Sequence, residues 1–218
     1  MKKRFMLLVL PVLLSHGLAV SQGKGTTNDC RVREGTLCAD MNLNSVDFHG
    51  ADLSNSQFSG SNMEGAKLSR TNFTAANLTR TDLRRADLRE AIMVNADLRA
   101  ANLTKANLAA AKLNNANLQN VIGEGADFRE SILKGADFAG AEMRTASLLG
   151  ADAARANFRS ADLSGTSFRK ANLEGANFTN ANLRGADLRE TRLHQATFTG
   201  ADMAGCIGCP SEPGRSPR

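Results

Sequence analysis

The chain has 218 residues, with 27 lysines and arginines against 22 aspartates and glutamates, a formal net charge of +5. Three of the basic residues lie at the extreme N-terminus, and the long central part of the chain is close to neutral. Such a mixed charge favours solubility and argues against a nucleic-acid groove and against an acidic imitation of nucleic acid. The chain also lacks Trp and Tyr, which stack on bases in many single-strand binding proteins.

The first 21 residues are typical of a secretory signal peptide. Lys2, Lys3 and Arg4 form a basic start, an apolar run follows at 5–14, and small residues suited to cleavage come next. The run is too short to span a bilayer as a mature helix. We therefore expect residues 1–21 to be removed, giving a periplasmic or secreted protein with no stable membrane span. An uncleaved apolar anchor is the alternative.

Residues 22–40 are polar and contain two of the four cysteines. They precede a long repeated region, and the end of a stack of repeats exposes apolar surface and unpaired strand edges. We expect this segment to lead into the first coil of the stack and to cover its open end as an N-terminal cap.

A five-residue repeat runs through residues 41–205 without a change of register, giving 33 units. The third residue is Leu, Phe or Met in 31 units, with Gly123 and Ala153 as exceptions, and the first is Ala in 23. This period fits neither an amphipathic helix nor a flat strand. It fits a short extended piece with two inward side chains, followed by a turn, and units this short must stack as a solenoid. At the two exceptions we expect neighbouring side chains to fill the missing volume.

The composition of the repeat supports a turn at the end of each unit. Twelve glycines occupy the fifth position, where a tight corner favours a residue that tolerates positive φ. Residues 41–205 contain no proline, which agrees with a hydrogen-bonded stack because proline cannot donate to a ladder between coils.

The unit pattern A(D/N)LXX, as in ANLRG at 181–185 and ADLRE at 186–190, resembles the pentapeptide repeat family over about three quarters of the chain. The resemblance implies an all-β fold, a right-handed, four-sided (quadrilateral) β-helix solenoid with four units per coil and about eight coils. The central Leu or Phe and the small first residue would point into its interior.

Phenylalanine spacing points independently to a coil of 20 residues. Several central phenylalanines recur in one phase of 20, which predicts a ladder of rings on one wall, where ring contacts add to the area that the rings bury. A scattered distribution of Phe among central positions is the alternative. The phenylalanines in this phase are Phe58, Phe138, Phe158, Phe178 and Phe198.

The four cysteines lie outside the repeat, with Cys30 and Cys38 before it and Cys206 and Cys209 after it. Eight coils spaced by about 4.8 Å would separate the ends by about 40 Å, whereas disulfide-bonded Cα atoms lie within about 7 Å. On the implied fold we expect two local disulfides, Cys30–Cys38 and Cys206–Cys209, in an exported protein. A redox-active pair at the C-terminal end and a four-cysteine zinc site shared by two molecules are the alternatives. We expect residues 206–218 to form a C-terminal cap and a disordered tail.

The charged residues of the repeat form a pattern on the expected coil. Units of the type AD(L/F)RE recur at multiples of 20 residues, so they share one wall. Their arginines would form a line flanked by carboxylates, which is a possible interaction strip for a protein partner. A solvated face of ion pairs is the alternative. The strip consists of Arg89, Arg129 and Arg189 from these units, together with Arg169, which falls in the same phase of 20 residues.

Catalytic patterns are not apparent in the sequence. His49 and His194 stand at outward positions of near-terminal coils, and the carboxylates recur so regularly that no acid–base pair stands out. There is also no phosphate-binding glycine loop and no zinc signature. We therefore expect no catalytic residue, no cofactor and no metal site.

The sequence favours an exported, non-enzymatic structural or protein-interaction module with an unidentified protein partner and no nucleic acid. Its oligomeric state is open. The family resemblance implies an alternative, a DNA mimic that binds DNA gyrase or topoisomerase IV and protects against quinolones. This chain departs from that pattern because it carries an export signal, its repeat is near neutral, and it has no evident C-terminal helical segment for dimerisation. An enzyme or redox protein that uses Cys206 and Cys209 is a third hypothesis.

Overall fold

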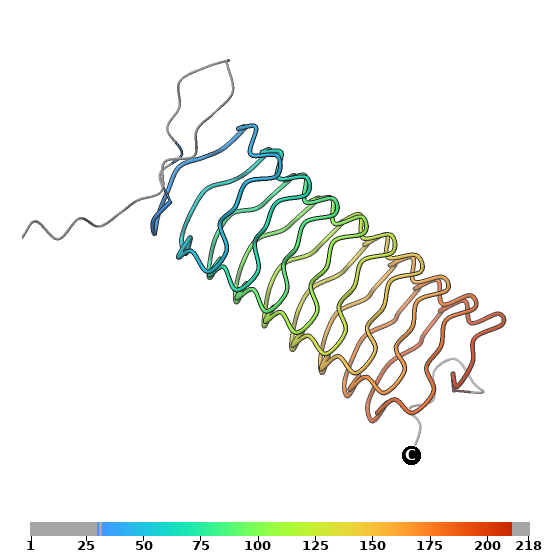
Figure 1. Ribbon diagram of the computed structural model, residues 1–218. Helices are drawn as coiled ribbons and strands as arrows, with labels where there is room; N and C mark the ends of the chain where they lie inside the picture. Colours follow the sequence, from blue (N-terminus) through green and yellow to red (C-terminus); the bar gives the residue numbers. More distant parts are fainter. Residues whose placement is uncertain (1–29, 31, 211–218) are drawn as a thin grey trace, which may run out of the picture.

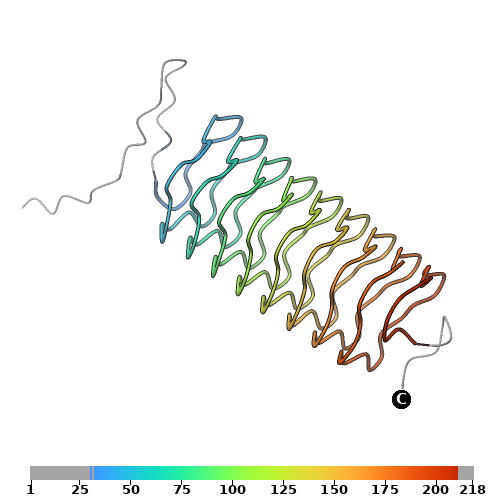
Figure 2. The same ribbon diagram turned by 45° about the vertical axis from the view of Figure 1, so that its right-hand side comes forward.

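The protein is a straight rod of stacked coils, with its first and last coils at opposite ends (Figures 1 and 2). The structure, a computed structural model, describes residue 30 and residues 32–210. The predicted signal peptide, much of the predicted N-terminal cap and the tail after Pro210 lie outside the described residues.

Successive coils are joined by parallel β-bridges between residues that are 20 apart. The 31 bridges begin with Leu37↔Gln57 and end with Asp187↔Ile207, and each involves only the second residue of a unit. Because a unit has five residues, four units make one coil, and the predicted four-sided β-helix is confirmed. The bridged stack extends slightly beyond the predicted range of 41–205 at both ends.

Two kinds of backbone hydrogen bond connect the bridged residues of each coil to those of the next. The third residue donates its N–H to the second residue one coil on, as from Leu108 to Asp127 (2.7 Å). The second residue donates back to the first residue one coil earlier, as from Asn107 to Ala86 (2.9 Å). The second residue of each interior unit thus has both its N–H and its C=O paired between coils, as buried backbone requires.

The fourth and fifth residues of each unit form the corner. Every fifth residue from Asp40 to Gly205 has a positive φ between 54° and 71°, and 22 of these residues are not glycine. The sequence predicted such corners from the glycines alone. The other residues adopt the same conformation because, from Asp40 to Gly185, the corner N–H is held by the next coil, as from Lys105 to the carbonyl of Glu124 (2.9 Å).

The first and third residues of nearly every unit are buried and form a continuous core. The predicted ring ladder is present from Phe138 to Phe198. Centroids lie 5.1 Å apart between Phe138 and Phe158, and 5.0 Å apart for the next two pairs, with interplanar angles of 14° or less. Phe58 stands apart from this ladder and contacts Phe73 edge-on at 5.9 Å.

Hydroxyl groups replace alanine at some buried first positions. Thr71 and Thr81 donate their hydroxyls to the carbonyls of Phe48 and Phe58, at 2.7 and 2.9 Å. Within the described part of the chain, every buried side-chain nitrogen or oxygen has a hydrogen-bond partner. These polar side chains therefore do not impose the cost of an unsatisfied group in the core.

Gly123 lies at a third position where most units have a large side chain. A Cβ atom built on Gly123 would lie 2.7 Å from the sulfur of Met143, which occupies the same position one coil on. The Met143 side chain therefore takes up the space above Gly123, as expected. A flexible thioether is suited to filling such a gap.

Candidate interaction surface

The aspartates and asparagines at second positions stabilise the corners. Their side-chain oxygen accepts the N–H of the fourth residue, as Asp87 does from Arg89 (3.2 Å) and Asp127 from Arg129 (3.0 Å). This is an Asx turn, in which Asp and Asn bond to the backbone two residues on. This role was not predicted from the sequence, although Asp or Asn occupies the second position in 22 of the 33 units and was its signal.

Amide side chains at the second position also connect neighbouring coils. Asn72 donates to Asp52 at 2.9 Å, and Asn182 donates to Asp162 at 3.0 Å, in each case one coil earlier. An asparagine one coil after an aspartate supplies the N–H donor that a second carboxylate would lack. The choice between Asp and Asn thus serves contacts between coils.

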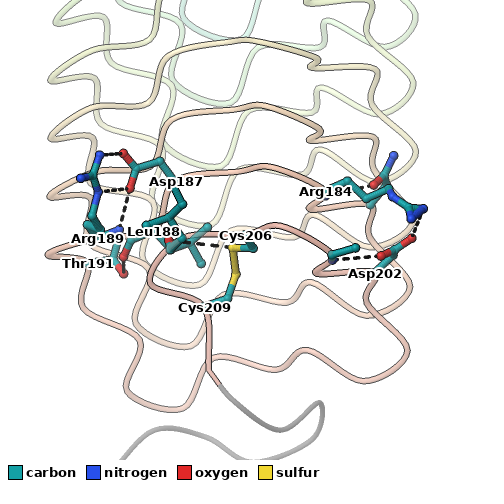
Figure 3. Close-up of a disulfide and its surroundings, with 11 residues drawn as sticks. Arg184, Asp187, Leu188, Arg189, Thr191, Asp202, Cys206 and Cys209 are labelled. Atoms are coloured by element: carbon teal, nitrogen blue, oxygen red, sulfur yellow. Dashed lines mark hydrogen bonds and ion pairs between the residues drawn. A yellow bond between two sulfur atoms is a disulfide. The ribbon is translucent and has the colours of Figure 1, made fainter.

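The four arginines of the predicted strip lie on one wall, which we call the arginine wall. It comprises the units that begin at residue 46 and recur every 20 residues up to 186–190. Three of its arginines bind the aspartate of their own unit through Nε and Nη2. These distances are 2.8 and 2.7 Å for Arg89, 2.8 and 2.6 Å for Arg129, and 2.9 and 2.6 Å for Arg189 (Figure 3).

Arg169 is paired differently because its unit has Ser167 in place of the aspartate. Its Nε and Nη2 atoms donate to Glu190 one coil on, at 2.8 and 2.6 Å. All four strip arginines therefore carry a carboxylate partner. Ala109 and Leu149 lie between Arg89, Arg129 and Arg169 along the wall, so these three alternate with apolar residues.

These ion pairs keep the aspartates of the arginine wall ionised. The hydrogen bonds from Arg189 lower the pKa of Asp187 to about 2, and those from Arg89 lower the pKa of Asp87. Burial alone would raise the pKa of Asp127, but the hydrogen bonds from Arg129 outweigh it, so this pKa is also lowered. The strip is consequently a lattice of opposite charges, and its role in recognition stays a prediction.

An adjacent wall carries ion pairs that cross from coil to coil. Arg84 contacts Asp82 of its own unit at 2.6 Å and Glu64 one coil earlier at 3.0 Å. Arg144 contacts Asp162 one coil on at 3.1 Å. These carboxylates are thus neutralised by arginines of the same chain.

The two outward histidines take no part in a cluster of reactive groups. The Nδ1 atom of His49 lies 2.7 Å from the hydroxyl of Ser69 one coil on, and His194 is exposed at the C-terminal end. In residues 30 and 32–210, no group of three or more His, Cys, Asp and Glu side chains could hold a metal ion. Over the same residues, no helix is long and apolar enough to cross a membrane.

Both expected disulfides are present, one at each end of the stack. Cys30 and Cys38 have a Cα–Cα distance of 5.4 Å, and Cys206 and Cys209 one of 5.8 Å. Cys38 occupies the third position of the unit 36–40 and is fully buried, so it takes the place of a core Leu or Phe. Cys206 begins the unit that follows the predicted repeat.

Comparison with known proteins places this geometry in a family. The family described as Pentapeptide repeats matches in eight copies that together extend over residues 34–207. No curated protein matches the chain. Among solved structures, HetL, a pentapeptide repeat protein involved in heterocyst differentiation regulation from Nostoc sp. strain PCC 7120, is 28% identical. The match covers 80% of this chain and 85% of HetL, with a TM-score of 0.48.

Two further solved structures are similar to this chain. The pentapeptide repeat protein Rfr23 from Cyanothece 51142 is 32% identical over 44% of this chain and 63% of its own, with a TM-score of 0.30. QnrB1, a plasmid-mediated fluoroquinolone resistance protein, is 19% identical over 78% of this chain and 90% of its own, with a TM-score of 0.43. The repeat match and the 20-residue bridge register lead to the same conclusion: the chain belongs to the pentapeptide repeat family.

Proposed function

We propose that this chain is an exported, non-enzymatic solenoid that serves as a structural or protein-interaction module in the cell envelope or outside the cell. The observation that carries the proposal is that all four cysteines form disulfides, one pair at each end of the stack. Disulfides persist in the periplasm and outside the cell and are rare in the cytosol. They therefore agree with the signal-like residues 1–21, which lie outside the described residues.

The arginine wall is the surface that we assign to a protein partner. The strip arginines are about half exposed, between 46% and 57%, although each is held by a carboxylate. Holding an arginine in place lowers the side-chain entropy that binding would otherwise cost. A rigid wall of alternating charges therefore suits a partner surface with the opposite alternation, since complementary charges determine register.

The charge pairing argues against mimicry of DNA. An imitation of the phosphate backbone needs carboxylates that are free to meet the basic groove of a DNA-binding enzyme. Here four carboxylates of the arginine wall, Asp87, Asp127, Asp187 and Glu190, are held by arginines of the same chain. We therefore favour a protein partner other than a topoisomerase.

Export is tested by localisation together with N-terminal sequencing. The native gene, with a C-terminal tag, is expressed in its own host, the cell is fractionated, and the mature protein is sequenced. A periplasmic or secreted product that begins close to residue 22 is the expected result. A cytoplasmic product that retains Met1 would contradict export, and binding to DNA gyrase would then be the next assay.

The strip is tested by cross-linking in the same cellular fraction. One variant replaces all four strip arginines by alanine, and a matched control replaces four cations of other walls, Arg80, Lys112, Arg155 and Arg159. The strip variant should lose the proteins that cross-link to wild type, while the control keeps them. Identical cross-linked partners in both variants would rule out the strip as the binding surface and leave the export result untouched.

A further inference from the structure

The two disulfides differ in how accessible they are. Cys30 and Cys38 are buried, with 5% and 0% of their surfaces exposed. Cys206 and Cys209 are only partly buried at the end of the last described coil (Figure 3), and Ile207 between them is 50% exposed. Because disulfide exchange requires a thiolate to reach a sulfur atom, a reductant meets the C-terminal disulfide first.

The C-terminal disulfide encloses the final pairing of the stack. Ile207 forms the last bridge: its N–H donates to the carbonyl of Ala186 at 2.9 Å, and its carbonyl accepts the N–H of Leu188 at 2.7 Å. Gly208 lies directly against the preceding coil, since a Cβ atom there would be 2.8 Å from the nitrogen of Arg189. The loop closed by Cys206 and Cys209 therefore holds two residues on the strand edge of the arginine wall.

The edge that this loop contacts belongs to the last unit of that wall, at 186–190. Leu188 is 1% exposed, and its neighbours are the ion-paired Asp187 and Arg189. Two backbone hydrogen bonds hold Ile207 there. Such contacts at the end of a repeat stack open more readily than those in the middle, because only one neighbouring coil supports them.

We propose that the Cys206–Cys209 disulfide is a reducible latch: a dithiol reductant opens it while Cys30–Cys38 stays oxidised, and residues 206–209 then leave the edge at 186–189. The opening uncovers Leu188 and the backbone beside Arg189. It makes the C-terminal end of the arginine wall responsive to the redox state of the compartment. The latch does not depend on the identity of any partner.

The exchange is balanced between one dithiol and one disulfide. A thiolate of the reductant attacks one sulfur of the Cys206–Cys209 bond, which breaks, and the other cysteine leaves as a thiolate. The second thiol of the reductant then attacks the mixed disulfide and releases the remaining cysteine. The reductant becomes a disulfide and gives up two electrons and two protons, which the two cysteines take up as thiols.

The expected size of the effect follows from loop closure. A disulfide that closes a four-residue loop limits the conformations that residues 206–209 can adopt once they leave the edge. Its loss therefore raises the equilibrium constant for local opening by about twentyfold. The exchange of the Leu188 and Ile207 amides should accelerate by that factor on reduction. Phe168 lies one coil earlier, and its amide donates to the carbonyl of Asp187 at 2.8 Å. This amide should keep its exchange rate and serves as the internal control.

The test treats the folded, oxidised protein with increasing dithiothreitol, alkylates free thiols and locates them by peptide mass spectrometry, with hydrogen exchange measured in parallel. Cys206 and Cys209 should be alkylated at concentrations that leave Cys30 and Cys38 unmodified. A double variant, Cys206→Ser with Cys209→Ser, should show the faster exchange without reductant. A matched Cys30→Ser, Cys38→Ser variant should leave the C-terminal amides unchanged.

Two results would overturn the latch. One is reduction of both disulfides over the same range of dithiothreitol, or of Cys30–Cys38 first. The other is unchanged exchange at Leu188 and Ile207 in reduced wild-type protein. The wild-type measurement decides the matter even where a serine variant does not fold.

Discussion

Replacement of Phe158 by leucine measures what the ring ladder contributes to stability. Phe158 is fully buried and contacts three other rings: it stacks on Phe138 and Phe178 and meets Phe168 edge-on at 5.7 Å. Leucine should fit without disturbing the coil, because leucine occupies the same wall position in three earlier coils. These are Leu78, Leu98 and Leu118.

Phe128→Leu is the matched control, since Phe128 is equally buried but has one ring contact, with Phe138 at 5.9 Å. The apolar area lost is similar at both sites, so it cancels in the comparison. Each ring pair contributes about 0.5–1.5 kcal/mol beyond its buried area. Phe158→Leu loses two more pairs, so it should destabilise the protein by about 1–3 kcal/mol more than Phe128→Leu.

The assay is unfolding in guanidinium chloride followed by circular dichroism, with the midpoints compared at equal slope. Long repeat arrays need not unfold in one step, so hydrogen exchange of the two coils provides a second readout. Equal losses for the two variants would refute the argument, because the stacked rings would then contribute nothing beyond their buried area.

Three further perturbations test the core, the corners and the ion pairs. Leu108→Asp places an unpaired carboxylate in the centre of the stack, so its β-type circular dichroism should be lost or its melting temperature sharply lowered; melting like wild type would contradict the inward assignment. Gly208→Ala should destabilise the last coil far more than Gly185→Ala: a Cβ at 208 meets backbone at 2.8 Å, whereas at 185 it meets nothing within 4 Å and only the positive φ is unfavourable. Hydrogen exchange of the last coil compares the two alanine variants, and equal effects would show that the close approach at Gly208 does not add to the cost. The pKa of Asp187 is lowered to about 2, so its stabilisation is complete above the unfolded value near 3.9 and is lost as pH falls through about 2. Asp187→Asn should therefore flatten stability against pH between about 4 and 2; an unchanged profile in acid titration would show that the ion pair with Arg189 does not contribute.

The coil could be predicted from the sequence because each unit repeats the same local demands. A solenoid of this kind is nearly one-dimensional, so the pattern of one unit implies the contacts of the next. The boundaries were harder to place. Cys38 fills an inward third position where the pattern has Leu or Phe, and Ile207 forms a bridge after the last regular unit. Cys38 is a cysteine and Ile207 follows one, and the repeat pattern contains no cysteine.

The alignment of the strip arginines could also be predicted, but their partners could not. Three arginines bind the aspartate two residues earlier, a pairing that depends on the bend of the Asx turn. Arg169 instead binds Glu190 in the next coil because Ser167 offers no carboxylate. Sequence spacing places the aspartate of the same unit and the glutamate of the next coil on the same wall. Only the side-chain geometry decides which of them an arginine binds.

The structure limits where function can be encoded on this solenoid. The first and third residues fill the core, the second stabilises the turn, and the fifth adopts a left-handed conformation. Only the side chain of the fourth residue carries no such structural role, and on the arginine wall this position holds the strip. A partner of the strip would therefore contact fourth positions, where Arg89 and Arg129 are separated by Ala109. Changing Ala109 to arginine would test this most directly: the core and the turn remain as they are, so any change in binding must come from the altered charge pattern.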